Sequence, residues 1–399
     1  MAQTLPQADW TVREDLARLV AALGAEQARY VGGAVRDTLL GKAIHDIDIA
    51  TTLLPAEVID TCKAAGIRIV PTGIDHGTVT AILPGGPVEI TTLRRDVSTD
   101  GRRATVAFAQ DWREDAARRD FTINALYAHP ETSAISDYFG GLDDLEHGRV
   151  RFIGDAHARI REDHLRILRY FRFQARFGDA TDPEAIAACR ALAPTLKGLS
   201  RERVAMELLA LLALPDPVLS VRLMKDLGVL EVILPETRAR EINCLATLVE
   251  TERREGAVAD ADRRLAALLP PLRSVAESVA ARLRLSRQQR SRLTTAAERV
   301  ATDTEHPRAL AYREGMEAAR DRLLLQGASL AALEGWDVPQ LPLKGGEIVA
   351  RGIAAGPDVA RILHRIEDRW IAEDFPDRTR VKTLLDQEVA GASSARDQP

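Results

Sequence analysis

The feature that most constrains the fold of this chain is a change of hydrophobic periodicity near residue 150. Before it, short alternating segments typical of strands are mixed with segments of helical period. From residue 155 onward, apolar residues recur almost only at three- and four-residue spacing. The mixed pattern requires a sheet covered by helices, and the later pattern requires helices packed on helices. We therefore predict an α+β protein, with a small mixed-sheet domain over 1–150 followed by an all-α remainder.

The composition is that of a globular protein free of the membrane. Hydrophobic residues make up 46% of the chain, no apolar run approaches the ~18 residues of a membrane span, and the N-terminus lacks the pattern of a signal peptide. The three cysteines are far apart, at Cys62, Cys189 and Cys244, and form no CxxC motif. Cysteines spaced in this way are typical of free thiols in a protein from a reducing compartment. We therefore expect a cytoplasmic protein with no disulfide or zinc framework.

The charge is unevenly distributed, although the net value is only -5. Residues 151–176 contain seven arginines and three acidic residues, and residues 281–320 contain nine arginines and five acidic residues. Two interpretations stay open for the second stretch: a solvated helix face, or a surface that contacts nucleic acid.

The segment VGGAVRDTLLGKAIHDIDIATT, residues 31–52, combines a glycine turn with two carboxylates. In a strand, Asp46 and Asp48 project from one face and repel each other unless a cation lies between them. Mg²⁺ takes one or two carboxylates together with substrate phosphates. Gly33 lets backbone N–H groups approach an anion at the start of a helix, and Arg36 in its first turn is placed to contact a triphosphate. The segment therefore predicts a metal site beside a phosphate site.

Four segments in this order resemble the signature of the class II tRNA nucleotidyltransferases and bacterial poly(A) polymerases, within the polymerase-β nucleotidyltransferase superfamily. After VGGAVRDTLLGKAIHDIDIAT come RRDFTINALYA, DYFGGLDDLEHGRVRFIGDAHARI and REDHLRILRYFRFQARFG. The resemblance covers roughly residues 28 to 235. It implies a catalytic head over 1–150, a nucleotide-selecting and RNA-binding neck over 151–235, a tRNA-binding body and tail over 236–390, and a disordered tail over 391–399.

The resemblance also implies an activity and its partners. It implies that CTP and ATP are added, without a template, as the 3′-terminal CCA of tRNA, with Mg²⁺ as cofactor. The tRNA is expected to be held by its acceptor stem and elbow. In the RRD segment, Arg118 suits nucleotide phosphate, because a guanidinium contacts phosphate oxygens bidentately. Asp120 and Asn124 are expected to hold the local geometry. For Asp120 we expect a structural ion pair with Arg119 rather than a contact with the nucleotide.

The segment 161–178 carries the choice of nucleotide. Asp163 and Arg166 are three residues apart, so on a continuous helix they lie side by side. A carboxylate accepts and a guanidinium donates, and together they complement the pairing edges of cytosine and adenine but not those of guanine and uracil. The resemblance assigns Arg169 and Arg172 to nucleotide contact as well, and Glu162 to an orienting role.

Some alternatives remain at this level. Glu89, in PVEITTLR, is the candidate for a third catalytic carboxylate. A poly(A) polymerase, an enzyme that adds only CC or only A, and a non-catalytic tRNA-binding protein are the rival functions. The chain contains no GxxxxGK[ST] motif, which argues against P-loop chemistry. The polar stretch 94–115 is predicted to be a mobile loop or a hairpin, and the presence of its first part, RRDVSTDGRR at 94–103, favours addition of the complete CCA.

Overall fold

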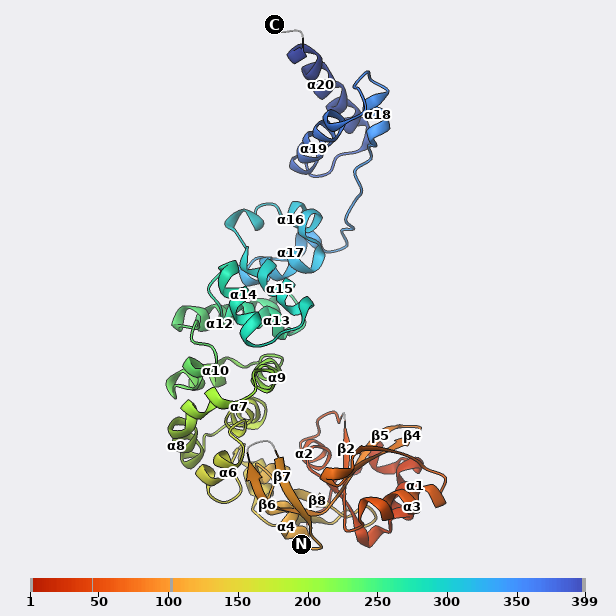
Figure 1. The fold of residues 1–399 in the computed structure, drawn as a ribbon, viewed down its shortest axis with the longest axis vertical. Coiled ribbons are helices and arrows are strands. Elements are labelled where there is room, and N and C mark those ends of the chain that lie inside the picture. Colours follow the sequence, from red (N-terminus) through yellow and green to blue (C-terminus); the bar gives the residue numbers. More distant parts are fainter. Residues whose placement is uncertain (1–2, 45, 101–102, 397–399) are drawn as a thin grey trace. The chain divides into compact units, whose positions relative to one another are not determined.

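The computed structural model describes residues 3–44, 46–100 and 103–396 (Figure 1). It divides into two compact units, Met1–Pro235 and Glu236–Pro399. The first unit contains every strand of the described residues, and the second is helical. The predicted α+β class, with a mixed-sheet head followed by helices, is confirmed.

The core of the head is a seven-stranded mixed sheet with the order β3-β4-β5-β2-β1-β8-β9. Its central strand β2 runs parallel to β5 and antiparallel to β1, and the remaining neighbours are antiparallel. The strands are β1 (Ala28–Val31), β2 (Ile47–Thr51), β3 (Arg68–Gly73), β4 (Thr78–Leu83), β5 (Gly86–Thr92), β8 (Leu126–Ala128) and β9 (Ile135–Asp137).

The alternation along β2 divides the sheet into two faces. Ile47 and Ile49 are buried in a core shared with α1 (Glu14–Leu23) and α3 (Pro55–Ala64), which cover this face in Figure 1. Asp48 and Ala50 point to the other face, because successive side chains alternate across a strand. That face packs a smaller apolar cluster that includes Tyr127. The carboxylate therefore lies away from the main core.

Short elements connect the sheet to the rest of the head. Helix α2 (Gly33–Leu39) follows β1 directly, and α4 (Trp112–Ala117) precedes the turn η4 (Thr122–Asn124). The stretch predicted to be a loop or hairpin forms the antiparallel pair β6 (Arg94–Asp100) and β7 (Arg103–Phe108), whose tip at 101–102 lies outside the described residues. The remaining elements of the head are η1 (Asp9–Val12), η2 (Ala25–Gln27), η3 (Ile74–His76) and α5 (Gly141–Glu146).

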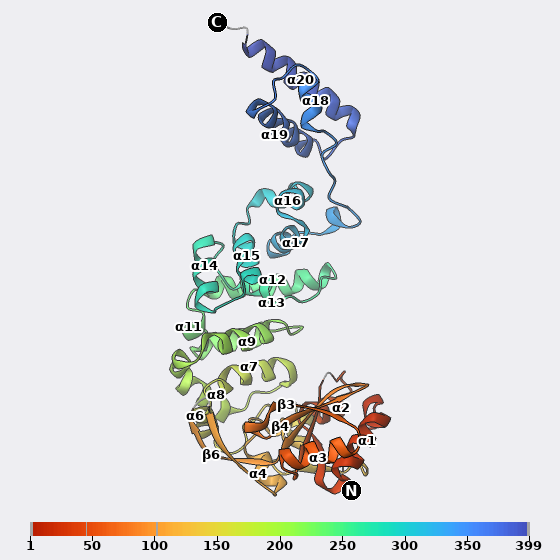
Figure 2. The ribbon, with the colours of Figure 1, turned by 45° about the vertical axis from the view of Figure 1, so that its right-hand side comes forward.

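The neck consists of helices alone, and Figure 2 shows α9 lying alongside α7. Aromatic rings join it to the head: Phe121 lies 5.0 Å from Phe173 and 4.9 Å from Phe152, measured between ring centroids. The helices are α6 (Ala156–Glu162), α7 (Arg166–Phe177), α8 (Pro183–Leu192), η5 (Ala193–Gly198), α9 (Arg201–Leu212), α10 (Val218–Asp226) and α11 (Val229–Ile233).

The second unit is built on helices of moderate length. A core around Trp370, Ile362 and Leu384 joins its last helices. The helices are α12 (Ala239–Arg254), α13 (Ala261–Ala267), α14 (Arg273–Arg282), α15 (Arg287–Ala297), η6 (Ala301–Asp303), α16 (Pro307–Glu314), α17 (Met316–Leu325), η7 (Ala331–Leu333), α18 (Gly345–Val349), α19 (Pro357–Ala372) and α20 (Arg378–Arg396).

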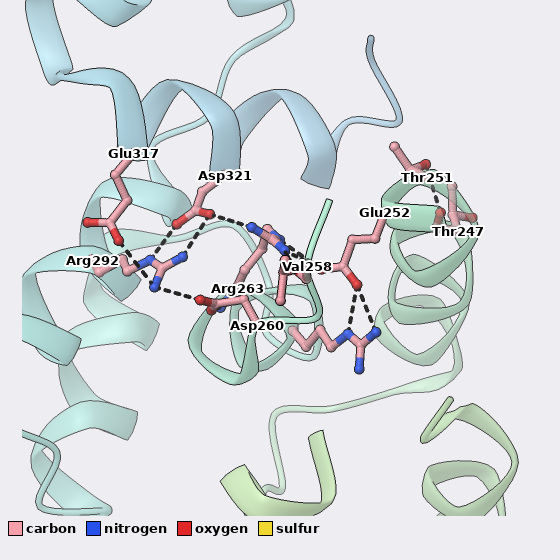
Figure 3. Close-up of polar contacts among 10 residues, drawn as sticks. Thr247, Thr251, Glu252, Val258, Asp260, Arg263, Arg292, Glu317 and Asp321 are labelled. Atoms are coloured by element: carbon pink, nitrogen blue, oxygen red, sulfur yellow. Dashed lines mark hydrogen bonds and ion pairs between the residues drawn. The ribbon is translucent and has the colours of Figure 1, made fainter. Parts of the chain in front are cut away.

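A network of buried charges crosses this unit (Figure 3). Arg263 donates to Glu252 at 2.8 Å and to Asp321 at 3.2 Å, and Asp321 also accepts from Arg292 at 2.6 Å. Glu252 and Asp321 are only 2% and 1% exposed. Burial of charge is tolerated here because each carboxylate meets guanidinium groups.

At least four of the nine arginines in the stretch 281–320 form ion pairs within the second unit, among them Arg292 with Asp321. Arg282 pairs with Glu236, Arg308 with Asp374, and Arg313 with Asp368. These pairs favour the structural interpretation for those arginines, because their charge is already met by carboxylates.

The C-terminal helix α20 continues to Arg396, so most of the predicted disordered tail 391–399 is helical. Residues 397–399 lie outside the described part. Two alanines among residues 391–396 suit a helix. No helix in the described ranges has the length and apolar character needed to cross a bilayer.

Candidate active site

Two carboxylates face each other across the parallel pair of β2 and β5. Asp48 is in register with Glu89, and the flanking partners Ile49 and Ile90 are buried on the opposite face. Because residues in register project from the same face of a sheet, Asp48 and Glu89 lie side by side. Asp46 lies one residue before β2. It is two residues from Asp48, the spacing of side chains on the same face of a strand. The strand pairing thus places Asp48 beside Glu89 in the middle of the sheet, and Asp46 directly precedes the same strand.

The charges around Asp48 favour a bound cation. The pKa of Asp48 is raised to about 6, first by burial and then by the negative charges of Glu89 and Asp46, while Arg119 partly opposes the shift. A carboxylate disfavoured in its charged form by like charges is stabilised by a bound cation. Within the described residues no three His, Cys, Asp or Glu side chains lie where they could hold a metal ion together. A metal held by two carboxylates would have to take its remaining ligands from substrate oxygens and water.

The glycine turn before α2 lies against two guanidinium groups. Gly32 has φ +71°, a conformation that favours glycine. A Cβ at Gly32 would lie 3.6 Å from Arg119 Nη1, and one at Gly33 would lie 3.7 Å from Arg36 Nη2. The turn combines close backbone approach with nearby positive charge. This arrangement suits the phosphates of a nucleotide.

Arg36, which is predicted to contact the triphosphate, also has partners within the protein. Its side chain is buried, with 5% exposure, and its guanidinium donates to Asp37 at 2.8 Å and to Asn124. It also lies 4.2 Å above the ring of Phe177 at the end of α7. These contacts place part of the Arg36 guanidinium at the junction of head and neck, whereas its Nη2 is the atom beside Gly33, so the predicted phosphate contact of Arg36 stays a prediction.

The RRD segment is tied to the neck by an ion pair that the sequence did not predict. Asp120 accepts from Arg169 at 2.6 and 2.8 Å and from Asn124 at 3.0 Å. The expected Arg119–Asp120 pair is wrong, because Arg119 pairs with Asp115 instead. Burial would raise the pKa of Asp120, but Arg169 and Asn124 lower it. Asp120 and Asn124 thus have the contacts of residues that hold the local geometry.

Asp115 binds both arginines of the RRD segment and was missed by the sequence analysis. Its Oδ1 accepts from Arg118 Nε at 2.8 Å, and its Oδ2 accepts from Arg119 Nη2 at 3.1 Å and from the Tyr127 hydroxyl at 2.7 Å. The three- and four-residue spacings from Asp115 to the arginines were a signal for this contact. The assignment of Arg118 to nucleotide phosphate stays a prediction.

The predicted side-by-side placement of Asp163 and Arg166 on one helix is wrong. Helix α6 ends at Glu162, Asp163 is extended with φ -150° and ψ 106°, and α7 begins at Arg166. Arg166 instead donates to Glu162 at 2.5 Å and to the Arg118 carbonyl at 3.3 Å. The ion pair between Glu162 and Arg166 fits the predicted role of Glu162 as a residue that orients its neighbour. Asp163 and Arg166 lie on the two sides of a break in the neck.

Two residues of α9 complete the polar shell of the neck. Arg203 Nη2 donates to Asp163 Oδ2 at 2.6 Å. Glu207 accepts from Arg172 at 2.7 Å and lies 3.6 Å from Arg169. Arg203 and Glu207 are four residues apart and so share one face of α9, but no sequence motif connected that face with 163–172. The predicted nucleotide contacts of Arg169 and Arg172 stay predictions.

Two family models match the chain. Residues 28–151 match the poly A polymerase head domain, and residues 180–240 match a model described as the probable RNA and SrmB-binding site of polymerase A. The first match contains the carboxylates and the glycine turn, and the second contains α9.

Named relatives extend the likeness over most of the chain. The human mitochondrial CCA tRNA nucleotidyltransferase 1 is 36% identical over 86% of this chain and 82% of its own length. The structure of the Bacillus stearothermophilus CCA-adding enzyme in complex with CTP covers 96% of this chain and 100% of its own, with a TM-score of 0.74 and 26% identity. That of the Thermotoga maritima CCA-adding enzyme complexed with tRNA_CCA covers 98% and 100%, with a TM-score of 0.73 and 22% identity.

Proposed function

The chain belongs to the family of CCA tRNA nucleotidyltransferases, and on that premise we propose that it builds or repairs the 3′-terminal CCA of tRNA from CTP and ATP. The structural observation that carries the proposal is the placement of Asp48 and Glu89 beside the Gly32 turn and Arg119, on one face of the sheet. Residues suited to a metal and to phosphates would thus lie within one domain. The relatives named above act on tRNA or bind CTP, which supports the same substrates here.

The reaction proposed is attack of the RNA 3′-hydroxyl on the α-phosphorus of the nucleotide. A bond forms between the 3′-oxygen and the α-phosphorus, the bond to the bridging oxygen breaks, pyrophosphate leaves, and the hydroxyl proton is lost. Asp46 and Asp48 would hold Mg²⁺, which activates the hydroxyl and stabilises charge on the phosphates. The Gly33 backbone and Arg118 would orient the triphosphate, so that catalysis rests on positioning and charge stabilisation.

Choice of nucleotide is assigned to the break between α6 and α7. Asp163 can accept from the exocyclic amine of cytosine or adenine, and Arg166 can donate to the neighbouring ring nitrogen. Guanine and uracil present the reverse order and would leave buried polar groups unpaired, which costs affinity. Arg169 and Arg172 would support this site through their contacts with Asp120 and Glu207. Protein side chains thus replace a template.

The location proposed is the cytoplasm. It rests on the three scattered cysteines, two of which, Cys62 and Cys189, are buried thiols. The human relative is named as mitochondrial, and fractionation of the source cells would test the assignment.

A nucleotide incorporation assay tests the function directly. The protein is incubated with Mg²⁺ and a tRNA that ends before CCA, with CTP and ATP singly and together. We expect two C residues with CTP alone and a complete CCA with both nucleotides. No incorporation would overturn the proposal. Long ATP-only tails on a generic RNA would favour the poly(A) polymerase, and addition limited to CC or to A would identify a partial enzyme.

A further inference from the structure

A single buried carboxylate, Asp115, binds both arginines of the RRD segment, Arg118 and Arg119. Asp115 is 1% exposed, and its two oxygens accept from Arg118, Arg119 and Tyr127, as described above. Oδ1 also accepts from the backbone N–H of Arg94, at the start of the β6–β7 hairpin, at 3.2 Å. Four donors therefore converge on one carboxylate from three separate segments of the head.

The hydroxyl of Tyr127 makes this arrangement rigid. It donates to Asp115 at 2.7 Å and accepts from Arg119 Nε at 3.0 Å, while the Tyr127 side chain is completely buried in β8. Arg119 is thus fixed at Nε by the hydroxyl and at Nη2 by the carboxylate. Its remaining terminal nitrogen, Nη1, is the atom that lies beside Gly32. Two of its groups are fixed so that the third is presented to the glycine turn.

We propose that Asp115 and Tyr127 are positioning residues for the nucleotide triphosphate, which act by orienting Arg119 and Arg118 toward the phosphate site. The inference rests on the proposed function, because it requires that a triphosphate binds at the Gly32–Gly33 turn. A guanidinium held in one orientation binds phosphate without losing rotamer freedom at that step. We expect the arrangement to be blind to the base, because its members act through their side chains, whereas Arg118 meets Arg166 at the break between α6 and α7 through its backbone carbonyl.

This positioning role predicts a defect confined to the phosphates. In Tyr127→Phe and Asp115→Asn, KM should rise roughly tenfold for both CTP and ATP, as expected for weakening of one charge-assisted contact. The inhibition constant of pyrophosphate should rise in parallel. Discrimination against UTP and GTP should stay within about twofold of the wild type, because a contact with phosphate affects all four nucleotides alike. The KM for tRNA should also stay within about twofold.

Asp15→Asn is the matched control. Asp15 also pairs with an arginine, Arg13 at 2.8 Å, and accepts from a backbone N–H, that of Gly85 at 2.7 Å. It lies on α1, whose apolar side packs on the opposite face of the sheet. We expect Asp15→Asn to leave KM for CTP and the pyrophosphate constant unchanged.

The outcomes separate the inference from the function. If KM for CTP in both variants stays within twofold of the wild type, the inference is overturned. If Asp115→Asn fails to fold, Tyr127→Phe decides alone, because it keeps the carboxylate and removes only one oxygen. If the wild type incorporates no nucleotide, the proposed function fails, and calorimetric titration of the same variants with CTP then decides whether Asp115 and Tyr127 position a triphosphate.

Discussion

Arg203 Nη2 donates to Asp163 Oδ2 at 2.6 Å, from α9 across the break between α6 and α7. The other oxygen of Asp163 accepts from the backbone N–H of Leu165 at 3.1 Å. Both oxygens of Asp163, the carboxylate proposed to read the base, therefore have hydrogen-bond donors from the protein. Arg203 is the donor from a different helix, so it ties the orientation of Asp163 to α9.

Arg203→Met should relax the choice of nucleotide. Without the guanidinium, Asp163 samples several rotamers and loses its fixed acceptor geometry, and we expect discrimination of CTP over UTP to fall by roughly tenfold. The measurement is kcat/KM for all four nucleotides. Arg201→Met is the control, since Arg201 donates only to the Lys197 carbonyl among the bonds described. Unchanged selectivity in Arg203→Met would show that Asp163 is oriented by other means.

Replacing either Asp46 or Asp48 by Ala should abolish turnover while leaving the fold intact. The physical reason is loss of a metal ligand at a surface where the remaining carboxylates cannot hold the ion alone. Single-turnover incorporation of CTP at increasing Mg²⁺ measures the effect, and circular dichroism checks folding. Asp60→Ala, an exposed carboxylate on α3, should keep full activity. Retained activity in Asp46→Ala or Asp48→Ala would refute the metal assignment.

Glu89→Gln tests the third carboxylate. Glu89 is in register with Asp48, so we expect it to contribute to the metal site and expect its neutralisation to lower activity roughly 10- to 100-fold, as for groups that support metal ligands. The concentration of Mg²⁺ that gives half-maximal activity should rise as well. Glu131→Gln, at an exposed turn of the head, provides the comparison. Equal activity and equal Mg²⁺ dependence in the two variants would remove Glu89 from the site.

Asp115 should also make the stability of the head depend on pH. Burial alone would raise the pKa of Asp115, but Arg119, Arg118 and Tyr127 lower it to about 2. A depressed carboxylate stabilises the fold above its unfolded pKa of about 3.9, and this stability is lost as pH falls toward 2. The contribution is on the order of 2 kcal/mol. Acid unfolding followed by circular dichroism should therefore be less steep in Asp115→Asn between about pH 4 and 2, and an identical profile would contradict this.

The strands and helices of the head were predictable because their signals are local. The alternation of Ile47, Asp48 and Ile49 and the glycines before α2 define elements that the structure contains. The pairing of β2 with β5 was harder to predict from the sequence, because the neighbours of a strand depend on the whole sheet. Glu89 was named as a candidate, and the register with Asp48 supplies the contact that a sequence alone does not contain.

The neck shows where local reasoning fails. The three-residue spacing of Asp163 and Arg166 is equally compatible with a continuous helix and with a break, and propensity does not decide between them. The break is stabilised by tertiary contacts, from Arg203 to Asp163 and from Arg166 to the Arg118 carbonyl. The contacts of Arg36 with Asn124 and Phe177 could not be predicted for a similar reason, because both partners are distant in sequence.

The buried network of the second unit yields a prediction that does not involve catalysis (Figure 3). Asp321 accepts from Arg263 at 3.2 Å and from Arg292 at 2.6 Å, and it is 1% exposed. Asp321→Asn would leave two arginines without their shared counter-charge. We expect a loss of about 1 to 3 kcal/mol in local stability, because each arginine loses one buried partner while Arg263 keeps Glu252 and Arg292 keeps Asp260.

Amide hydrogen exchange of the full chain can localise that loss to α13 and α17, since both helices carry members of the network. Glu317→Gln is the matched control. Glu317 lies on the same helix as Asp321 and only 3.4 Å from Arg292, but its side chain is 64% exposed. Its removal should therefore change stability by less than about 1 kcal/mol. Equal protection of the amides in the two variants would show that the burial of Asp321 does not determine its contribution to stability. Selective loss of protection in Asp321→Asn would show that the network stabilises α13 and α17.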